Sequence, residues 1–181
     1  LALIQGEAGG VVPELRGLHA WLAVLANDAV RRTLIAHDPL GLVLHGDVLN
    51  FSTQEKIQLL QALQQEATRY AHFRSQNWAS RPFAALATPD MQEHFKLWLQ
   101  LPDRHAAHQA VLDCVLDAME NGQSMPDLSA ELERVVRDKT YQDELRQSAV
   151  NTLCRYAGEN NDWTLTLDIA EALHAGQIED S

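Results

Sequence analysis

Apolar residues recur at spacings of three and four along most of the chain, which is the pattern of helices that each bury one face. After Pro13 and Glu14, the first such stripe consists of Leu18, Leu22 and Leu25. Residues 52–55, Ser-Thr-Gln-Glu, have the sequence of a capping box, and we expect the helix that follows to run to about residue 74. The pattern therefore predicts an all-α protein.

One short segment has two interpretations. Asp38 followed by Pro39 is typical of a helix N-terminus, and Gly46 suits the end of a brief helical turn. The run 41–45, Gly-Leu-Val-Leu-His, could instead form a short strand. The sequence leaves both interpretations open.

The second half of the chain contains a near-repeat. Residues 110–121 and 149–160 match at an offset of 39 residues, with Ala, Val, Ala, Glu and Asn identical at corresponding places. A period of about 40 residues built from helices is typical of stacked helix pairs. We therefore expect antiparallel helix pairs stacked as a short HEAT-like α-solenoid, a class that usually binds other macromolecules.

These patterns also predict an organisation along the chain. We expect residues 1–12 to be a linker from a preceding region, because the chain does not begin with Met. Residues 13–101 are expected to form an N-terminal helical subdomain in which 75–87 is an irregular connection. Residues 102–176 should form two helix-pair repeats, and the polar residues 177–181 a frayed tail.

Charge is distributed unevenly over the 181 residues. Residues 1–100 carry 8 Lys and Arg against 9 Asp and Glu, whereas residues 101–181 carry 6 against 16. Phosphate backbones require basic residues, so we expect no direct nucleic-acid binding. A groove with Glu131, Glu133, Asp143 and Glu144 could attract a basic or neutral protein segment, although solvated outer helix faces explain the same charges.

Neither a membrane span nor a secretory leader is indicated. No apolar run approaches the roughly 18–20 residues of a membrane span. Cys114 and Cys154 fall at helix-interior positions of the two repeats, so we expect two buried free thiols on equivalent faces and a cytoplasmic location.

The search for catalytic or cofactor motifs is mostly negative. The chain has no Gly-x-x-x-x-Gly-Lys-Ser/Thr phosphate loop, no Gly-x-Ser-x-Gly elbow and no Cys-x-x-Cys pair. We therefore expect no enzyme, no cofactor and no metal. His105 and His108, together with Asp103, could coordinate a metal ion. We favour the interpretation that the two histidines are simply a pair on the surface.

A small all-α hydrolase is the alternative that the residues leave open. His45 and Asp47 could form an acid–base pair, with His94 as a further member of the site. A loop histidine beside a turn aspartate is common, so we favour the non-catalytic interpretation.

Aromatic and arginine residues mark a candidate contact site in the irregular connection. Trp78, Arg81 and Phe83 are of the types that dominate binding hot spots. The plainer interpretation is that Trp78 and Phe83 fill the joint between the front helices and the repeats. The other tryptophans, at positions 21, 98 and 163, fall on helical stripes or at a helix start, so packing explains them.

Several strings resemble a segment of large bacterial NACHT-type proteins. They are residues 13–23 (Pro-Glu-Leu-Arg-Gly-Leu-His-Ala-Trp-Leu-Ala), 37–41 (His-Asp-Pro-Leu-Gly), 46–48 (Gly-Asp-Val) and 82–86 (Pro-Phe-Ala-Ala-Leu). In those STAND-class signal-transduction ATPases the similar segment lies C-terminal to the nucleotide-binding module, and the resemblance covers roughly residues 9–140. It implies a helical repeat region that senses a partner or contacts the upstream ATPase module.

The repeat and the absence of catalytic motifs favour a non-catalytic protein-interaction or sensor module, and the resemblance implies that it is a fragment of a larger STAND-type signalling ATPase. The alternatives are a standalone helical adaptor that binds basic peptides and the small hydrolase. The phosphate loop of the STAND class is absent here, so the resemblance assigns no nucleotide-binding residue to this chain.

Overall fold

The computed structural model describes residues 10–74, 79–101 and 105–174 of the chain. Its α-helices are α1 (Arg16–Leu25), α2 (Asp28–His37), α3 (Pro39–His45), α4 (Thr53–Arg69), α5 (Gln92–Gln100), α6 (Ala106–Asn121), α7 (Ser129–Arg137), α8 (Asp143–Asn160) and α9 (Thr164–His174). Short 3-10 helices are η1 (Pro13–Leu15), η2 (Val48–Asn50), η3 (Arg81–Leu86), η4 (Pro89–Met91) and η5 (Pro126–Leu128). These residues include no strand, which confirms the all-α prediction.

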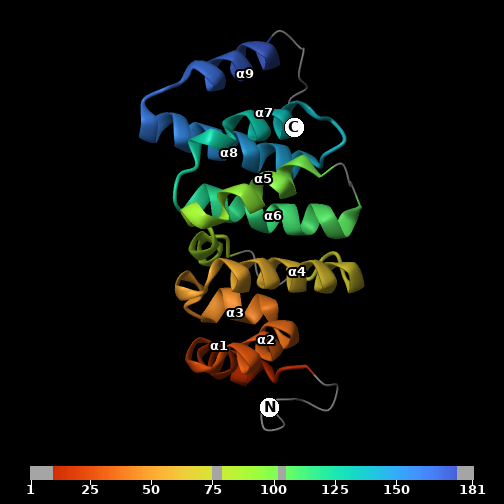
Figure 1. Cartoon of the computed structure of the whole chain (residues 1–181). Coiled ribbons are helices and arrows are strands. Elements are labelled where there is room, and N and C mark those ends of the chain that lie inside the picture. The colour runs from red at the N-terminus through yellow and green to blue at the C-terminus, as the bar shows by residue number, and fades with distance from the viewer. Residues whose placement is uncertain (1–9, 75–78, 102–104, 175–181) are drawn as a thin grey trace.

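The helices are stacked along one axis (Figure 1). At one end of the stack lie α1 and α2, and α9 lies at the other. In between, α4 packs on α6, α6 packs on α8, and α8 packs on α9. Helix α7 packs mainly on α8 rather than on α6, its predicted partner, so the stacked helix pairs and the HEAT-like class stay a prediction.

Buried residues form one continuous cluster that extends from Ala23 to Ala172. The largest side chains in it include Phe83 and Phe95, which are fully enclosed. Since η3 and α4 both contact α6, the packing is continuous across the predicted boundary at residues 101 and 102. The front helices and the repeats therefore share one core.

The segment that could have been a strand is helix α3. The Asp38 side chain accepts a hydrogen bond from the backbone N–H of Gly41 (2.9 Å), and Pro39 occupies the first helical position. Gly46 ends the helix. The strand interpretation is therefore wrong, because the cap and the proline together favour a helical start.

Helix α4 begins as expected and ends earlier. The capping box between Ser52 and Glu55 is present in both directions. The helix ends at Arg69 rather than near residue 74, and Tyr70 is extended. The turn that follows brings Arg74 back onto α6, where it meets Asp113 and Asp117. The ion pairs of Arg74 with α6 therefore require the chain to leave the helix before residue 74.

The predicted apolar stripe of α1 is on the wrong face. Leu18, Leu22 and Leu25 are exposed. In contrast, His19, Ala20 and Ala23 are fully buried. An added Cβ at Gly46 would lie 3.5 Å from the Ala20 Cβ, so small side chains let α1 approach the end of α3 closely. Close packing of small residues outweighs burial of the leucines here.

The two repeats share a detail of side-chain bonding. Asn121 and Asn160, which correspond in the repeat, each donate from Nδ2 to the carbonyl oxygen four residues earlier, both at 2.9 Å. Cys114 is buried as predicted, but Cys154 is only half-buried. The offset of 39 makes Leu153 the counterpart of Cys114, and Leu153 is the buried residue. The prediction of equivalent faces was thus wrong by one position.

Candidate functional site

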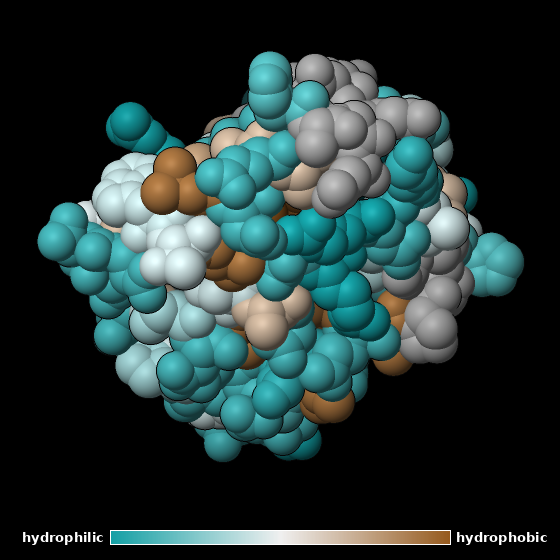
Figure 2. Space-filling view, turned by 90° about the horizontal axis from the view of Figure 1, so that it is seen from above, coloured by the Kyte–Doolittle hydropathy of each residue, from teal (hydrophilic) through white to brown (hydrophobic). Residues whose placement is uncertain are grey.

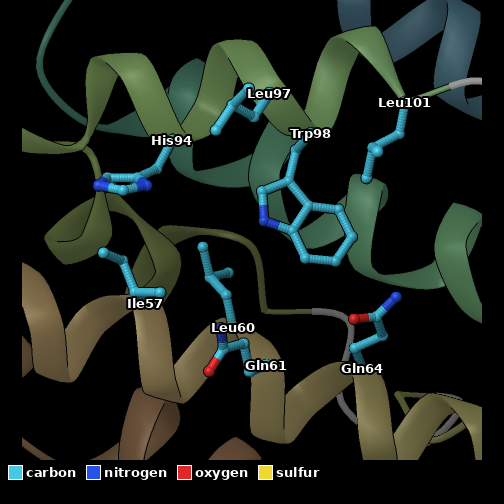
Figure 3. A pocket seen from close by; sticks show the side chains of 8 residues that line it. All are labelled: Ile57, Leu60, Gln61, Gln64, His94, Leu97, Trp98 and Leu101. Carbon is cyan, nitrogen blue, oxygen red and sulfur yellow. The ribbon is translucent and has the colours of Figure 1, made fainter.

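An apolar groove lies between α4 and α5 (Figure 3). Its volume is about 230 Å³, and it is lined by Ile57, Leu60, Gln61, Gln64, His94, Leu97, Trp98 and Leu101. Trp98 and Leu101 point from α5 toward α4, and Ile57 and Leu60 point back from α4 (Figure 3). Small-molecule sites typically have volumes of roughly 300–1,000 Å³, so this groove suits one or two side chains better than a cofactor.

Helix α5 has two apolar faces, and this creates the groove. Phe95 and Leu99 are fully buried and hold α5 in the core. Leu97, on another side of the same helix, is 60% exposed, and Leu101 is also exposed. A helix that only needed to pack would carry polar residues there. The exposed leucines therefore add apolar surface at the groove.

Trp98 is held in place from behind. Its ring stacks on the imidazole of His108 in α6, with centroids 5.2 Å apart and planes 12° from parallel. His108 is buried, so the indole has a firm support. The tryptophan lining the groove is consequently pre-oriented, which lowers the entropy lost when a ligand binds. The expected surface pair of His105 and His108 is wrong for His108, whereas His105 is exposed.

The α4 side of the groove adds uncharged polar groups. Gln61 and Gln64 lie one helical turn apart, and each amide carries both donors and acceptors. In the described part of the chain none of the eight lining residues is Asp, Glu, Lys or Arg. Lys96 on the neighbouring face of α5 pairs with Glu131 (3.8 Å). The groove therefore favours a ligand that is apolar and uncharged where it enters.

Two of the three residues predicted as an anchor in the irregular connection are described, and Arg81 and Phe83 differ in exposure. Phe83 is fully buried, and the Arg74 guanidinium lies over its ring at 4.5 Å from the centroid. Arg81 is exposed at the start of η3. Trp78 lies outside the described residues. Phe83 thus packs the joint between the front helices and the repeats, as the plainer interpretation held.

The four predicted carboxylates are dispersed, and the structure gives ion pairs to three of them. Glu131 has a side chain only 13% exposed and lies against Lys96 and Gln100 of α5. Glu133 pairs with Arg137 (2.7 Å), and Asp143 pairs with Arg146 (3.0 Å). Glu144 is exposed on α8. Much of this charge is therefore engaged between helices or along a helix.

Arg74 lies at the centre of a buried cluster of charged side chains. Its guanidinium donates to Asp113 (2.6 Å) and Asp117 (2.5 Å). Burial raises the pKa of Asp113 to about 6; Arg74 acts against this shift, and the carboxylates of Asp117 and Glu144 add to it. These ion pairs join Arg74, which follows α4, to the middle of α6. They therefore hold α4, one wall of the groove, against α6.

The residues of the hydrolase alternative are not brought together in the groove. His94 lines it, but His45 and Asp47 do not. Asp47 instead accepts a hydrogen bond from the Asn50 amide (2.7 Å). Within residues 10–74, 79–101 and 105–174, no three His, Cys, Asp or Glu side chains are grouped as a metal site would need.

Sequence reasoning missed Leu97 and Leu101. Periodicity did not identify them, because only the structure shows that the core takes Phe95 and Leu99 of α5. Trp98 was assigned to packing, and it does pack on His108, but the same ring also lines the groove.

Comparisons with known proteins found no matching family model, no matching curated protein and no matching solved structure. The resemblance to NACHT-type proteins accordingly stays a prediction. None of the helices in the described ranges combines the length and apolarity needed to cross a bilayer.

Proposed function

We propose that the chain is a non-catalytic protein-interaction module whose ligand is an extended segment of another protein, bound in the α4–α5 groove. The observation that carries this proposal is the pair of exposed leucines, Leu97 and Leu101, on either side of the supported Trp98 ring. Exposed apolar side chains around a rigid aromatic are the composition of a binding hot spot.

An extended segment fits the groove better than a helix does. Main-chain N–H and C=O groups are satisfied internally in a helix but are free in an extended chain. The amides of Gln61 and Gln64 offer donors and acceptors to such free groups. Alternate side chains of an extended segment would then enter the space beside Trp98 and Leu97.

The electrostatics favour a neutral ligand over a basic one. The groove lining contains no Asp, Glu, Lys or Arg, and Glu131 already pairs with Lys96 of α5. The standalone adaptor for basic peptides would rely on Glu133, Asp143 and Glu144, which lie on α7 and α8, away from the groove lining. We therefore place ligand recognition in apolar contacts rather than in charge.

Selection from a random peptide display library tests this proposal. Wild-type protein should enrich peptides that carry two large apolar side chains two residues apart, without a requirement for Lys or Arg. Leu97→Glu should abolish the enrichment, while the matched control Leu167→Glu, at another exposed leucine on α9, should retain it. Enrichment of basic peptides, or equal enrichment by Leu97→Glu, would contradict the groove as the binding site.

From the resemblance we further propose that this module is the partner-sensing region of a STAND-type signalling ATPase. The full-length gene provides the test. An upstream Gly-x-x-x-x-Gly-Lys-Ser/Thr loop would support it, and a gene without one would favour the standalone adaptor. We also propose a reducing, cytoplasmic location, which is supported by the two cysteines being free thiols in the structure.

A further inference from the structure

The outer face of α1 carries a stripe of large apolar residues. Leu18, Trp21, Leu22 and Leu25 are 53%, 52%, 42% and 80% exposed. Their spacings of three and four place them on one side of the helix. Val30 of α2 is also exposed. This is the spacing that interior helices of the stack use for burial, and here it faces outward.

Helix α1, which carries this stripe, lies at one end of the stack (Figure 1). On its other side α1 packs against α2 and α3. The ends of helical stacks normally carry a polar outer face, because an apolar one exposes the next stacking surface. The opposite end of the molecule is largely hydrophilic, with apolar areas that are separate and small (Figure 2). The outer face of α1 is therefore the surface where we expect a partner to bind.

Charge indicates that a second copy of the chain can approach this face. The single charged residue of α1 is Arg16, and its guanidinium is directed inward onto Asp38. Residues 1–100 are nearly neutral, whereas residues 101–181 carry most of the net charge of −11. Two copies joined through α1 would therefore hold their acidic repeats far apart.

The stripe is also suited to pairing with itself. In an antiparallel pair of α1 helices about a two-fold axis, the same residues of both copies form the contact. The centre of the stripe, Trp21 with Leu22, then meets its own counterpart, while Leu18 of one copy meets Leu25 of the other. Such a contact continues the layer-on-layer packing that joins the helices within the chain.

We propose that the chain forms a two-fold symmetric dimer through the outer face of α1, with Leu18, Trp21, Leu22 and Leu25 of each copy at the interface. The α4–α5 groove is not part of this contact, so both copies keep their grooves open. The dimer is therefore a two-armed binding module, and its affinity for a ligand with two suitable segments gains from avidity.

Sedimentation equilibrium of the whole chain tests the dimer. With concentrations from about 5 to 200 μM, the mass should rise from 20.2 kDa toward twice that value. Leu18→Lys and Leu25→Lys should each weaken association by about tenfold or more, since charge is placed in the apolar contact. Leu167→Lys, at an exposed leucine on α9, is the matched control and should leave the dissociation constant within about twofold.

Circular dichroism of each variant guards against a folding artefact. Because the α1 leucines are exposed in the single chain, their replacement should leave the helical signal and the unfolding midpoint close to wild type. A wild-type chain that remains monomeric at about 200 μM would overturn the proposal. A dimer that Leu167→Lys disrupts and the two α1 variants do not would overturn it equally.

Discussion

Arg16 and Asp38 form a two-pronged ion pair that ties α1 to the start of α3. Arg16 Nε lies 2.7 Å from Asp38 Oδ2, and Arg16 Nη2 lies 2.6 Å from Oδ1. The same carboxylate caps α3 through the Gly41 N–H. An added Cβ at Gly41 would lie only 2.1 Å from the carboxylate, so glycine there leaves it room. Residues 13–23 and 37–41 thus meet at one structural joint.

The first prediction concerns the ion pair itself. Asp38→Asn keeps an oxygen that can cap α3 but removes the charge that faces Arg16, so it should lower the free energy of unfolding by about 1–3 kcal/mol. Guanidinium denaturation at neutral pH measures this difference. Asp28→Asn, at an exposed position in the first turn of α2, is the control and should cost less than about 0.5 kcal/mol. If both variants lowered the free energy of unfolding by the same amount, the ion pair of Asp38 would not contribute more to stability than an exposed carboxylate.

The second prediction concerns pH. Burial disfavours the charged form of Asp38, but the hydrogen bonds from Arg16 and Gly41 outweigh it, so its pKa lies below the ordinary value. A carboxyl whose folded-state pKa is lowered contributes stability above its unfolded pKa and loses it as the pH falls through the folded one. The stability gap between wild type and Asp38→Asn should therefore be constant above about pH 5 and shrink below about pH 4. Denaturation curves over this range measure the gap, and one that stays constant to pH 3 would contradict the assignment.

The third prediction concerns the joint between η3 and α6. At Gly122 an added Cβ would lie 2.5 Å from both the Ala84 carbonyl oxygen and the Ala87 Cβ, so Gly122→Ala should destabilise by about 1–3 kcal/mol. Gly158→Ala provides the contrast, since it lies inside α8 with its nearest neighbour at 3.7 Å. That change should stabilise by about 0.5–1 kcal/mol. Thermal unfolding of both variants checks the opposite signs, and a neutral Gly122→Ala would mean that the joint is looser than described.

The fourth prediction concerns the two thiols. Burial raises the pKa of Cys114 to about 12, although Arg74 nearby acts against it, so this thiol should stay protonated and inert in the native state. Cys154 is half-buried and should react first. Mass spectrometry after a short treatment with iodoacetamide at pH 8 should show one modified cysteine, identified as Cys154 by peptide mapping. Denaturant should expose both, and native-state labelling of Cys114 at the same rate would contradict the described burial.

Local signals in the sequence predicted much of the fold. The capping box at Ser52 and the Asp38-Pro39 start are short-range features, because the groups that stabilise each helix end lie within four residues of one another. The near-repeat falls on two long helices, α6 and α8, and the equivalent bonds of Asn121 and Asn160 reflect it. These features depend little on the rest of the molecule.

The failures have a common physical reason. Helix α1 and helix α5 each carry two apolar faces, and periodicity alone cannot tell which face the neighbours bury. In α1 the small residues Ala20 and Ala23 are buried and the leucines are not. In α5 the core takes Phe95 and Leu99, so Leu97 is left for the groove. The end of α4 was misplaced because the partner of Arg74 lies about 40 residues further along the chain.

The central claim is that the α4–α5 groove binds an extended apolar segment beside Trp98. Two-dimensional ¹H–¹⁵N NMR of the tryptophan indole N–H groups tests it directly, in a titration with the peptide obtained from the display selection. Trp98→Phe assigns the Trp98 resonance, and the exposed Trp163, which lies between α8 and α9 and does not line the groove, serves as an internal reference. We predict that the chemical shift of the Trp98 indole N–H changes saturably with peptide concentration. The chemical shift of the Trp163 indole N–H should stay at its value in the free protein. Saturable binding that moves Trp163 and leaves Trp98 unchanged would contradict the account.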